Sequence, residues 1–145
     1  MSEAQVLEPT LDWAAVELAR RRNQARALLL QSGQAVSLEM LARGRDSSAA
    51  AARQWVSRHR RNGHLVTVTQ AGQVLVPTFQ LDEGFGRDLA AASVVARLMG
   101  AGMDAWEIWD WVTHPNGWLD GRRPQDLLHE DPDAVTRAID GLLQE

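Results

Sequence analysis

Apolar residues recur at intervals of three or four along much of the chain, the spacing that places them on one face of an α-helix. Thr10 can cap the first helix that this pattern predicts, and Ser32-Gly33 ends it. The apolar positions of this helix are Trp13, Val16, Ala19, Ala27 and Leu30. Its apolar stripe is longer than a small domain needs, so we expect it to be a candidate for dimerisation.

Two shorter helices follow, separated by a break that is rich in glycine and small polar residues. Residues 37–43 predict the first, with Ser37 as its cap, and residues 49–61 predict the second. Asn62-Gly63 ends the second helix, because both residues tolerate the left-handed conformation of a helix C-terminus. Two short helices joined by a tight turn are typical of a helix-turn-helix.

Two runs rich in β-branched residues, 65–69 and 74–76, flank the turn 70–73 and predict a β-hairpin that Pro77 ends. In this position the hairpin predicts the wing of a winged helix-turn-helix. The hairpin contains no arginine, so any contact that it makes with a nucleic acid would come from uncharged side chains. These are Thr67, Thr69, Gln70 and Gln73.

The rest of the chain predicts helices alone. Helical spacing covers 89–99, 103–113 and 124–129, and a last helix opens with Asp131-Pro132-Asp133, which places an N-cap acid before a first-turn proline. The stretch 82–86, with two glycines and two acidic residues, lies between apolar segments and predicts a domain boundary. We therefore predict a mainly α protein, with a winged helix-turn-helix domain over 1–80 and a small all-helical domain over 81–145.

Charge is divided between the two halves of the chain. The net charge of the 145 residues is −4, yet residues 1–77 carry ten arginines and six acidic residues, whereas residues 78–145 carry five arginines and thirteen acidic residues. A basic first half favours contact with a polyanion such as DNA. The acidic second half would repel DNA and favours a protein partner.

Composition narrows the function classes further. The chain has no cysteine, which excludes disulfides and thiolate metal sites. It has no run of the roughly 18 apolar residues that a membrane span needs. We expect a cytoplasmic protein that makes no contact with a membrane.

The second short helix, residues 49–61, carries the side chains that most clearly indicate a binding function. If Ala52 and Val56 pack inward, its polar side chains face outward, where arginine can bind guanine or phosphate and glutamine can bind adenine. Backbone N–H groups at the start of the helix can also bind a phosphate. The predicted DNA-binding residues are Ser47, Ser48, Arg53, Gln54, Ser57, Arg58 and Arg61. The alternative is that this basic face is only solvated.

Four of the six tryptophans stand in a short span of the second half, at positions 106, 109, 111 and 118. A small core does not readily enclose so many, and an exposed tryptophan is a typical interface anchor. The same segment contains, in order, Pro115-Asn116, Leu119, Gly121, Arg123-Pro124 and Leu127-Leu128. This ordered string resembles the C-terminal toxin-binding domain of Xre/MbcA/ParS-type antitoxins, over about residues 80–143.

The resemblance implies an antitoxin that neutralises a RES-type toxin, which consumes or transfers ADP-ribose from NAD. It also implies binding to the protein's own promoter as double-stranded DNA, and assembly as a homodimer or a larger hetero-oligomer. Many relatives carry an all-helical front domain where this chain predicts a wing, so the DNA contacts rest on the residues of this chain alone. We expect the toxin-binding surface at Trp109, His114, Asn116, Trp118, Arg122 and Arg123.

No arrangement of residues predicts catalysis. The four histidines, at 59, 64, 114 and 129, lack a metal-ligand spacing such as His-Glu-x-x-His, and helix ends or phosphate contacts account for them. Gly84-Phe85-Gly86 lacks the further glycine of a phosphate-binding loop. We expect no enzymatic activity, no metal and no cofactor. The alternative function is a stand-alone transcriptional regulator, whose second domain mediates self-assembly or binds another partner.

Overall fold

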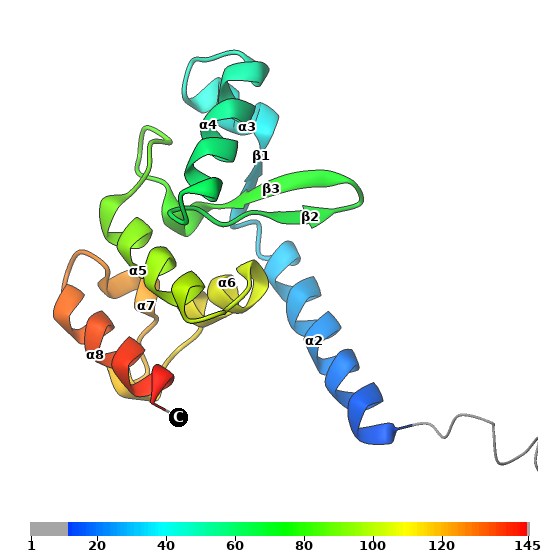
Figure 1. Ribbon diagram of the computed structural model, residues 1–145, viewed down its shortest axis with the longest axis vertical. Coiled ribbons are helices and arrows are strands. Elements are labelled where there is room, and N and C mark those ends of the chain that lie inside the picture. Colours follow the sequence, from blue (N-terminus) through cyan, green and yellow to red (C-terminus); the bar gives the residue numbers. More distant parts are fainter. Residues whose placement is uncertain (1–11, 145) are drawn as a thin grey trace, which may run out of the picture.

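The computed structural model describes residues 12–144 (Figure 1). This part of the chain is mainly helical, with seven α-helices and a small three-stranded antiparallel sheet, which confirms the predicted mainly α class. The α-helices are α2 (Trp13–Gln31), α3 (Leu38–Gly44), α4 (Ala49–Arg61), α5 (Leu89–Gly100), α6 (Ala105–Thr113), α7 (Pro124–Leu127) and α8 (Pro132–Leu143). The strands are β1 (Ala35–Ser37), β2 (Val68–Gln70) and β3 (Gln73–Pro77), and the 3-10 turns are η1 (Thr78–Gln80) and η2 (Gly117–Leu119).

Polar side chains fix the starts of most helices. Ser37 and Asp131 cap α3 and α8 as predicted. Asp104 caps α6 within a capping box, since Glu107 returns a hydrogen bond to the backbone N–H of Asp104. Thr10, the predicted cap of the first helix, lies outside the described residues. Asp12 caps α2, where its carboxylate accepts hydrogen bonds from two backbone N–H groups of the first turn.

The sheet has the strand order β1-β3-β2. The sequence pattern did not predict β1, which is only three residues long. This strand pairs with β3 and places Val36 opposite Val76. The turn between β2 and β3 places Ala71 and Gly72 at φ values of 51° and 77°, the left-handed pair that a two-residue hairpin requires. The predicted first strand, 65–69, is wrong in its first half. Leu65 and Val66 precede β2 and are buried.

The core is made of three clusters of buried residues. One lies among α3, α4 and the sheet, and a larger one lies among α5, α6, α7 and α8. The third joins the two halves of the chain, because Leu29 of α2 and Val68 of β2 pack with Trp109 of α6. Val66, from the loop after α4, also packs in the larger cluster. The two halves thus share buried contacts.

Gln80 is a fully buried polar residue at the junction of the two halves. Its amide oxygen accepts a hydrogen bond from Val66 N at 2.6 Å, and its amide nitrogen donates to Val66 O at 2.9 Å. The same nitrogen donates to Pro77 O at 3.1 Å. These bonds satisfy the backbone groups of a buried loop, which would otherwise be costly to remove from water.

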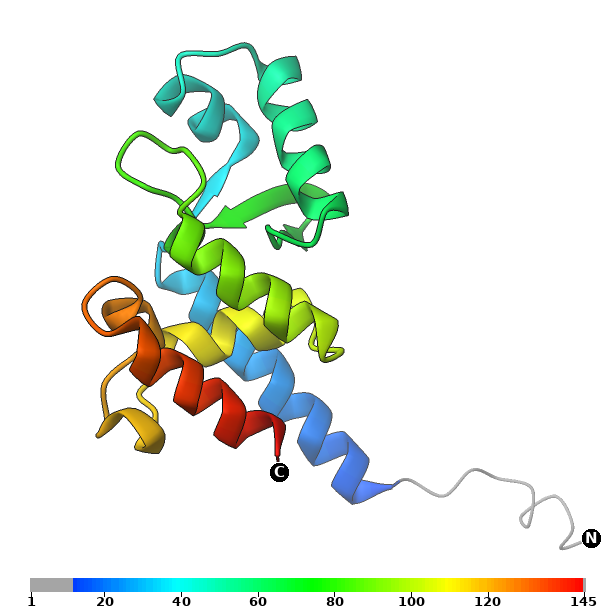
Figure 2. The same ribbon diagram turned by 60° about the vertical axis from the view of Figure 1, so that its left-hand side comes forward.

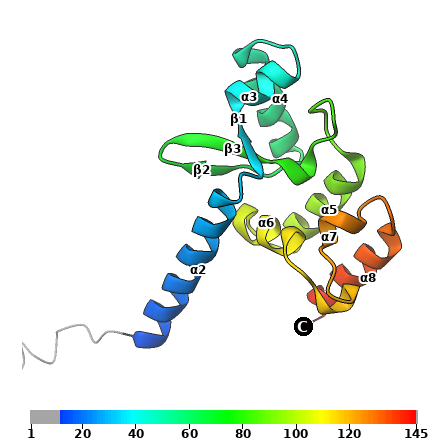
Figure 3. The same cartoon turned by 180° about the vertical axis from the view of Figure 1, so that it is seen from behind.

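Helix α2 projects from the rest of the molecule (Figures 1 and 3). Its C-terminal end packs against α6, whereas Trp13, Val16 and Leu18 in its first turns are exposed. No helix among residues 12–144 is both long enough and apolar enough to cross a membrane.

Candidate nucleic-acid interface

Helix α4 has one buried side and one exposed side. Ala52 and Val56 are buried in the cluster with α3 and the sheet, as predicted, and Trp55 is half-buried beside them. The opposite side presents the predicted DNA-binding residues of this helix. Arg53, Gln54, Arg58 and Arg61 are exposed, and Ser57 is half-buried between them.

The start of α4 uses one of the two predicted serines for its own structure. The Ser48 hydroxyl accepts a hydrogen bond from Ala51 N at 3.0 Å, so this side chain is a helix cap. Ser47 donates to the carbonyl oxygen of Ser48 at 3.2 Å. Both residues are exposed, and a phosphate at this helix end would meet the free backbone N–H groups of the first turn.

Helix α4 ends at Arg61, directly before Asn62-Gly63, as predicted. Asn62 has a right-handed conformation, with φ −81°, and only Gly63 is left-handed, with φ 76°. The helix ends where Asn62-Gly63 predicted, and Gly63 alone takes the left-handed conformation. A single left-handed glycine is enough to end a helix.

A latch from the second half of the chain holds the turn between α3 and α4, and we call it the Phe85 latch. The ring of Phe85 packs directly on Gly44, where any Cβ atom would overlap it. Arg45 donates a hydrogen bond to the carbonyl oxygen of Phe85 at 2.9 Å, and its guanidinium lies 4.1 Å from the centre of the Trp55 ring. Phe85 has φ 59°, a conformation that costs an L side chain energy unless its surroundings hold it.

One edge of the α4 face lies beside the hairpin. Arg53 lines a groove of about 320 Å³ with the start of α3 and with the hairpin residues Gly72, Gln73 and Val74. Arg60 donates a hydrogen bond to the Thr67 hydroxyl at 3.4 Å. The sequence reasoning left Arg60 out of the set, although it lies two helical turns after Arg53 and is exposed. That spacing was the available signal.

The other edge of the α4 face carries positive charge from several elements. The pKa of His59 is lowered, first by burial and then by repulsion from Arg87, Arg58, His64 and Arg45. Arg87 precedes α5 and contacts Nδ1 of His64 at 2.9 Å. Arg87 was not predicted as a site residue, since it is distant from α4 in the sequence and only the tertiary fold brings it near.

Some arginines of residues 12–144 are held in ion pairs and others are not. In residues 12–144, Arg53, Arg58 and Arg61 make no ion pair. In contrast, Arg20 and Arg21 share Glu17, Arg97 pairs with Asp140, Arg122 pairs with Glu130 and Arg123 pairs with Asp126. Unpaired guanidinium groups keep their full charge and all of their hydrogen-bond donors for an external anion.

Trp109, predicted for the toxin-binding surface, is fully buried, and that prediction is corrected. Trp109 packs among Leu29 and Val68 and stacks with Trp106 at a ring separation of 5.9 Å. The closely spaced tryptophans of α6 therefore fill a junction between elements. A buried indole cannot anchor a partner protein directly.

The other five predicted residues of this set lie on or near one loop. His114 ends α6 and is exposed, and its Nδ1 donates to Asp110 O at 2.8 Å. Asn116 accepts a hydrogen bond from Trp118 N at 2.8 Å and so caps η2. Arg122 and Arg123 are held in their ion pairs at 2.8 Å each.

Trp118 is the large exposed side chain of this loop, with 62% of its surface accessible. One side of its ring lies against Gly141 of α8, where a Cβ atom would overlap it. The missing side chain at Gly141 thus lets the indole pack directly on the last helix, while most of its surface stays accessible. An indole in this position can contact a partner protein.

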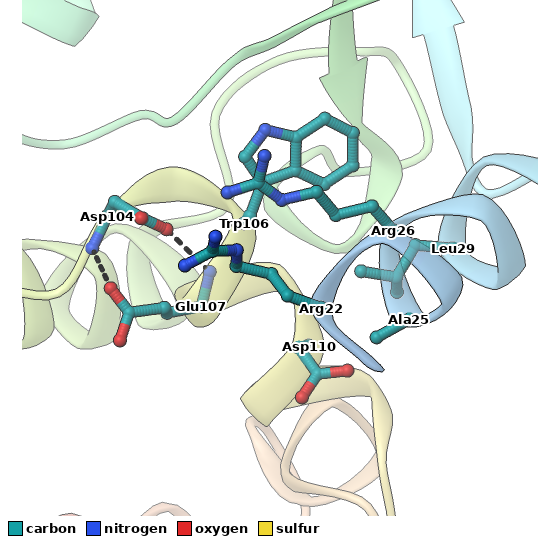
Figure 4. Close-up of a pocket in the computed structure, with 8 residues that line it drawn as sticks. All are labelled: Arg22, Ala25, Arg26, Leu29, Asp104, Trp106, Glu107 and Asp110. Carbon is teal, nitrogen blue, oxygen red and sulfur yellow. Dashed lines mark hydrogen bonds between the residues drawn. The ribbon is translucent and has the colours of Figure 1, made fainter. Parts of the chain in front are cut away.

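A separate hollow of about 350 Å³ lies between α2 and α6, and Figure 4 shows the side chains around it. The Arg26 guanidinium lies 5.1 Å from the centre of the Trp106 ring, and Arg22 reaches from α2 towards the acidic face of α6. Asp104 and Glu107 are occupied by the capping box. The stacking of Arg26 on Trp106 joins α2 to α6 here, and none of the predicted site residues lines this hollow.

Comparisons with known proteins give a structural neighbour. No protein-family model and no curated protein matches this chain. The NMR structure of Rv2175c is similar in fold, with a TM-score of 0.57 and 26% sequence identity. The similarity covers 72% of this chain and 77% of the other. The chain therefore shares the arrangement of most of its elements with a solved structure.

Proposed function

We propose that this protein binds double-stranded DNA through a winged helix-turn-helix, with α4 as the recognition helix and the β2–β3 hairpin as the wing. The observation that carries the proposal is the exposed face of α4, where three arginines stand without ion pairs among the described residues. The order of elements supports it. A helix and a strand precede two short helices joined by a turn, and a hairpin follows.

The chemistry of the face suits the major groove, which admits an α-helix. Gln54 and Arg61 lie near the middle of the exposed side, because successive residues turn by about 100° around a helix axis. Glutamine can bind adenine with two hydrogen bonds, and arginine can bind guanine in the same way. Arg53 and Arg58 lie to either side of this centre, where phosphates flank a groove.

The test is the affinity for duplex DNA from the region upstream of the protein's own gene, measured by fluorescence anisotropy at several salt concentrations. Binding that involves three to five phosphates gives a logarithmic salt slope of about −3 to −4.5. Arg53→Ala and Arg58→Ala should each reduce the slope by about one. A flat slope for the natural protein, or two variants that bind as it does, would refute the proposal.

Arg123→Ala is the matched control. It removes an exposed arginine that is already paired with Asp126 and lies in the acidic half of the chain. The salt slope of this variant should equal that of the natural protein. A random-sequence duplex, compared at the same salt concentrations, separates base recognition by Gln54 and Arg61 from contact with phosphates alone.

We also propose that the second half of the chain binds a protein partner through the Trp118 loop, and the toxin implied by the antitoxin resemblance is the first candidate partner. The exposed surface of the Trp118 indole, which packs on Gly141 of α8, favours this role. Co-expression with the product of the neighbouring gene tests it. Relief of growth arrest and a complex that purifies together would support the role, and unchanged binding by a Trp118→Ala, Arg122→Ala double variant would refute the surface.

A further inference from the structure

We propose that a groove between the loop after α4 and the first turns of α5 binds a backbone phosphate of the DNA, so that the footprint extends from α4 to the second half of the chain. This inference rests on the proposed DNA binding and adds a contact to it. The groove has a volume of about 550 Å³. Its lining residues are His64, Arg87, Leu89, Ala92, Ser93, Ala96 and Arg97, and we call it the α5 groove.

The α5 groove offers hydrogen-bond donors in a defined arrangement. Nη1 of Arg87 lies 2.9 Å from Nδ1 of His64. A guanidinium only donates, so Nδ1 accepts this bond and the imidazole carries its proton on Nε2. This contact leaves Nε2–H of His64 as a donor, and it leaves the other N–H groups of Arg87 for an anion.

The charge of the groove comes from Arg87. Arg97 lines the same groove, but its guanidinium is paired with Asp140 and also reaches the carbonyl oxygen of Thr136. Arg87 has no carboxylate partner among residues 12–144. The neighbouring carboxylate, Asp88, caps α5 and contacts His129.

The surroundings of His59 agree with this geometry, because its pKa is lowered first by burial and then by nearby arginines. One of these groups, Arg87, lines the α5 groove, and another, Arg58, belongs to the α4 face. The positive region is thus continuous from the recognition helix to the groove. In the ribbon view, α5 passes beneath the C-terminal end of α4 (Figure 2).

The shape of the groove fits a nucleic-acid backbone. Between Leu89 and Arg97, the side of α5 that faces it carries the short side chains Ala92, Ser93 and Ala96, which allow a bulky sugar-phosphate chain to approach closely. The hairpin on the opposite edge of α4 carries no charged side chain between positions 67 and 77. The uncharged hairpin cannot form an ion pair with a phosphate. The α5 groove supplies such a contact on the other edge of α4.

The experiment compares Arg87→Gln with Arg97→Gln, two arginines of one groove that differ in their pairing. Affinity for the upstream duplex is measured by anisotropy from about 50 to 200 mM salt. Loss of one phosphate contact makes the logarithmic salt slope about 0.9 less steep. Between about 50 and 200 mM salt, such a variant would therefore lose about three- to four-fold less affinity than the natural protein loses. We expect this change for Arg87→Gln on specific and random duplexes alike, no change for Arg97→Gln, and recovery of the slope in Arg87→Lys.

A second measurement follows the ring resonances of His64 by NMR while inorganic phosphate is added, with chloride at equal ionic strength as the control. We expect phosphate to shift them in the natural protein and not in Arg87→Gln. An unchanged slope in Arg87→Gln, with a reduced slope in Arg58→Ala, would overturn the groove contact and leave the proposed function standing. A response to inorganic phosphate without a change in slope would assign the groove to a free phosphate and overturn the DNA contact. A natural protein that binds no duplex would overturn both.

Discussion

Replacing Trp109 with alanine tests the junction between the two halves of the chain. The side chain is fully buried and packs with Leu29 and Val68, which come from elements that precede α5. A buried tryptophan removes about 200 Å² from water, worth about 5 kcal/mol at about 25 cal/mol per Å². Because alanine retains a small part of this, we expect Trp109→Ala to lower the free energy of unfolding by about 3–5 kcal/mol.

Trp118→Ala is the matched comparison, since it removes the same side chain from an exposed position. With 62% of its surface accessible, Trp118 should contribute no more than about 2 kcal/mol. Trp109→Phe gives a graded variant. The indole Nε1–H of Trp109 has no acceptor among residues 12–144, so phenylalanine removes a buried unsatisfied donor while it keeps most of the packing.

The assay is urea unfolding followed by far-ultraviolet circular dichroism, which reports all helices and does not depend on the tryptophans. We expect the order of stability to be natural protein, Trp109→Phe, then Trp109→Ala, each with a single transition because α2, β2 and α6 share the cluster around Trp109. If Trp109→Ala fails to fold, the phenylalanine variant still tests the order. Equal stabilities for Trp109→Ala and Trp118→Ala would refute the argument from burial.

Three further predictions concern single residues. Gln80→Leu should lower the free energy of unfolding by about 2 kcal/mol or more, because it leaves the buried N–H and C=O groups of Val66 without partners, and urea unfolding would show no loss if these groups found others. Asp104→Ala should cost about 0.5–2 kcal/mol by removing the cap of α6, and an unchanged melting temperature would contradict this. The pKa of His59 is lowered by burial and by the surrounding cations, so below about pH 6.5 the unfolded chain binds a proton that the folded chain resists. Stability should therefore fall as the pH decreases through this range, and His59→Gln should reduce the fall; identical pH profiles would show that another group titrates.

Most helix bounds of this protein can be predicted from residues near the helix ends. The bounds of α4 follow from the serine before Ala49 and the glycine after Asn62, and the start of α8 follows from Asp131-Pro132. Caps, glycines and helical spacing act over a few residues, so they can be found without knowledge of the fold. The outward direction of Arg53, Gln54, Arg58 and Arg61 also followed from spacing alone.

Contacts between segments that are distant along the chain could not be predicted from the sequence. Strand β1 is too short to show a pattern and exists because β3 pairs with it. The close spacing of four tryptophans in the second half of the chain led to the wrong prediction that Trp109 is exposed. Periodicity shows which residues share a helix face, but it does not show which faces other elements cover. Trp118 is exposed and Trp109 is buried for reasons of packing.

The sequence by itself determined the helices of this protein, the division of its charge and the side chains that α4 turns outward. Only the tertiary structure decided that Phe85 holds the turn before α4, and that Arg87 stands beside the face of that helix. The physical reason is distance along the chain. Caps and helical faces depend on neighbours within one or two turns, whereas the Phe85 latch and the α5 groove depend on residues that come together only when the core closes.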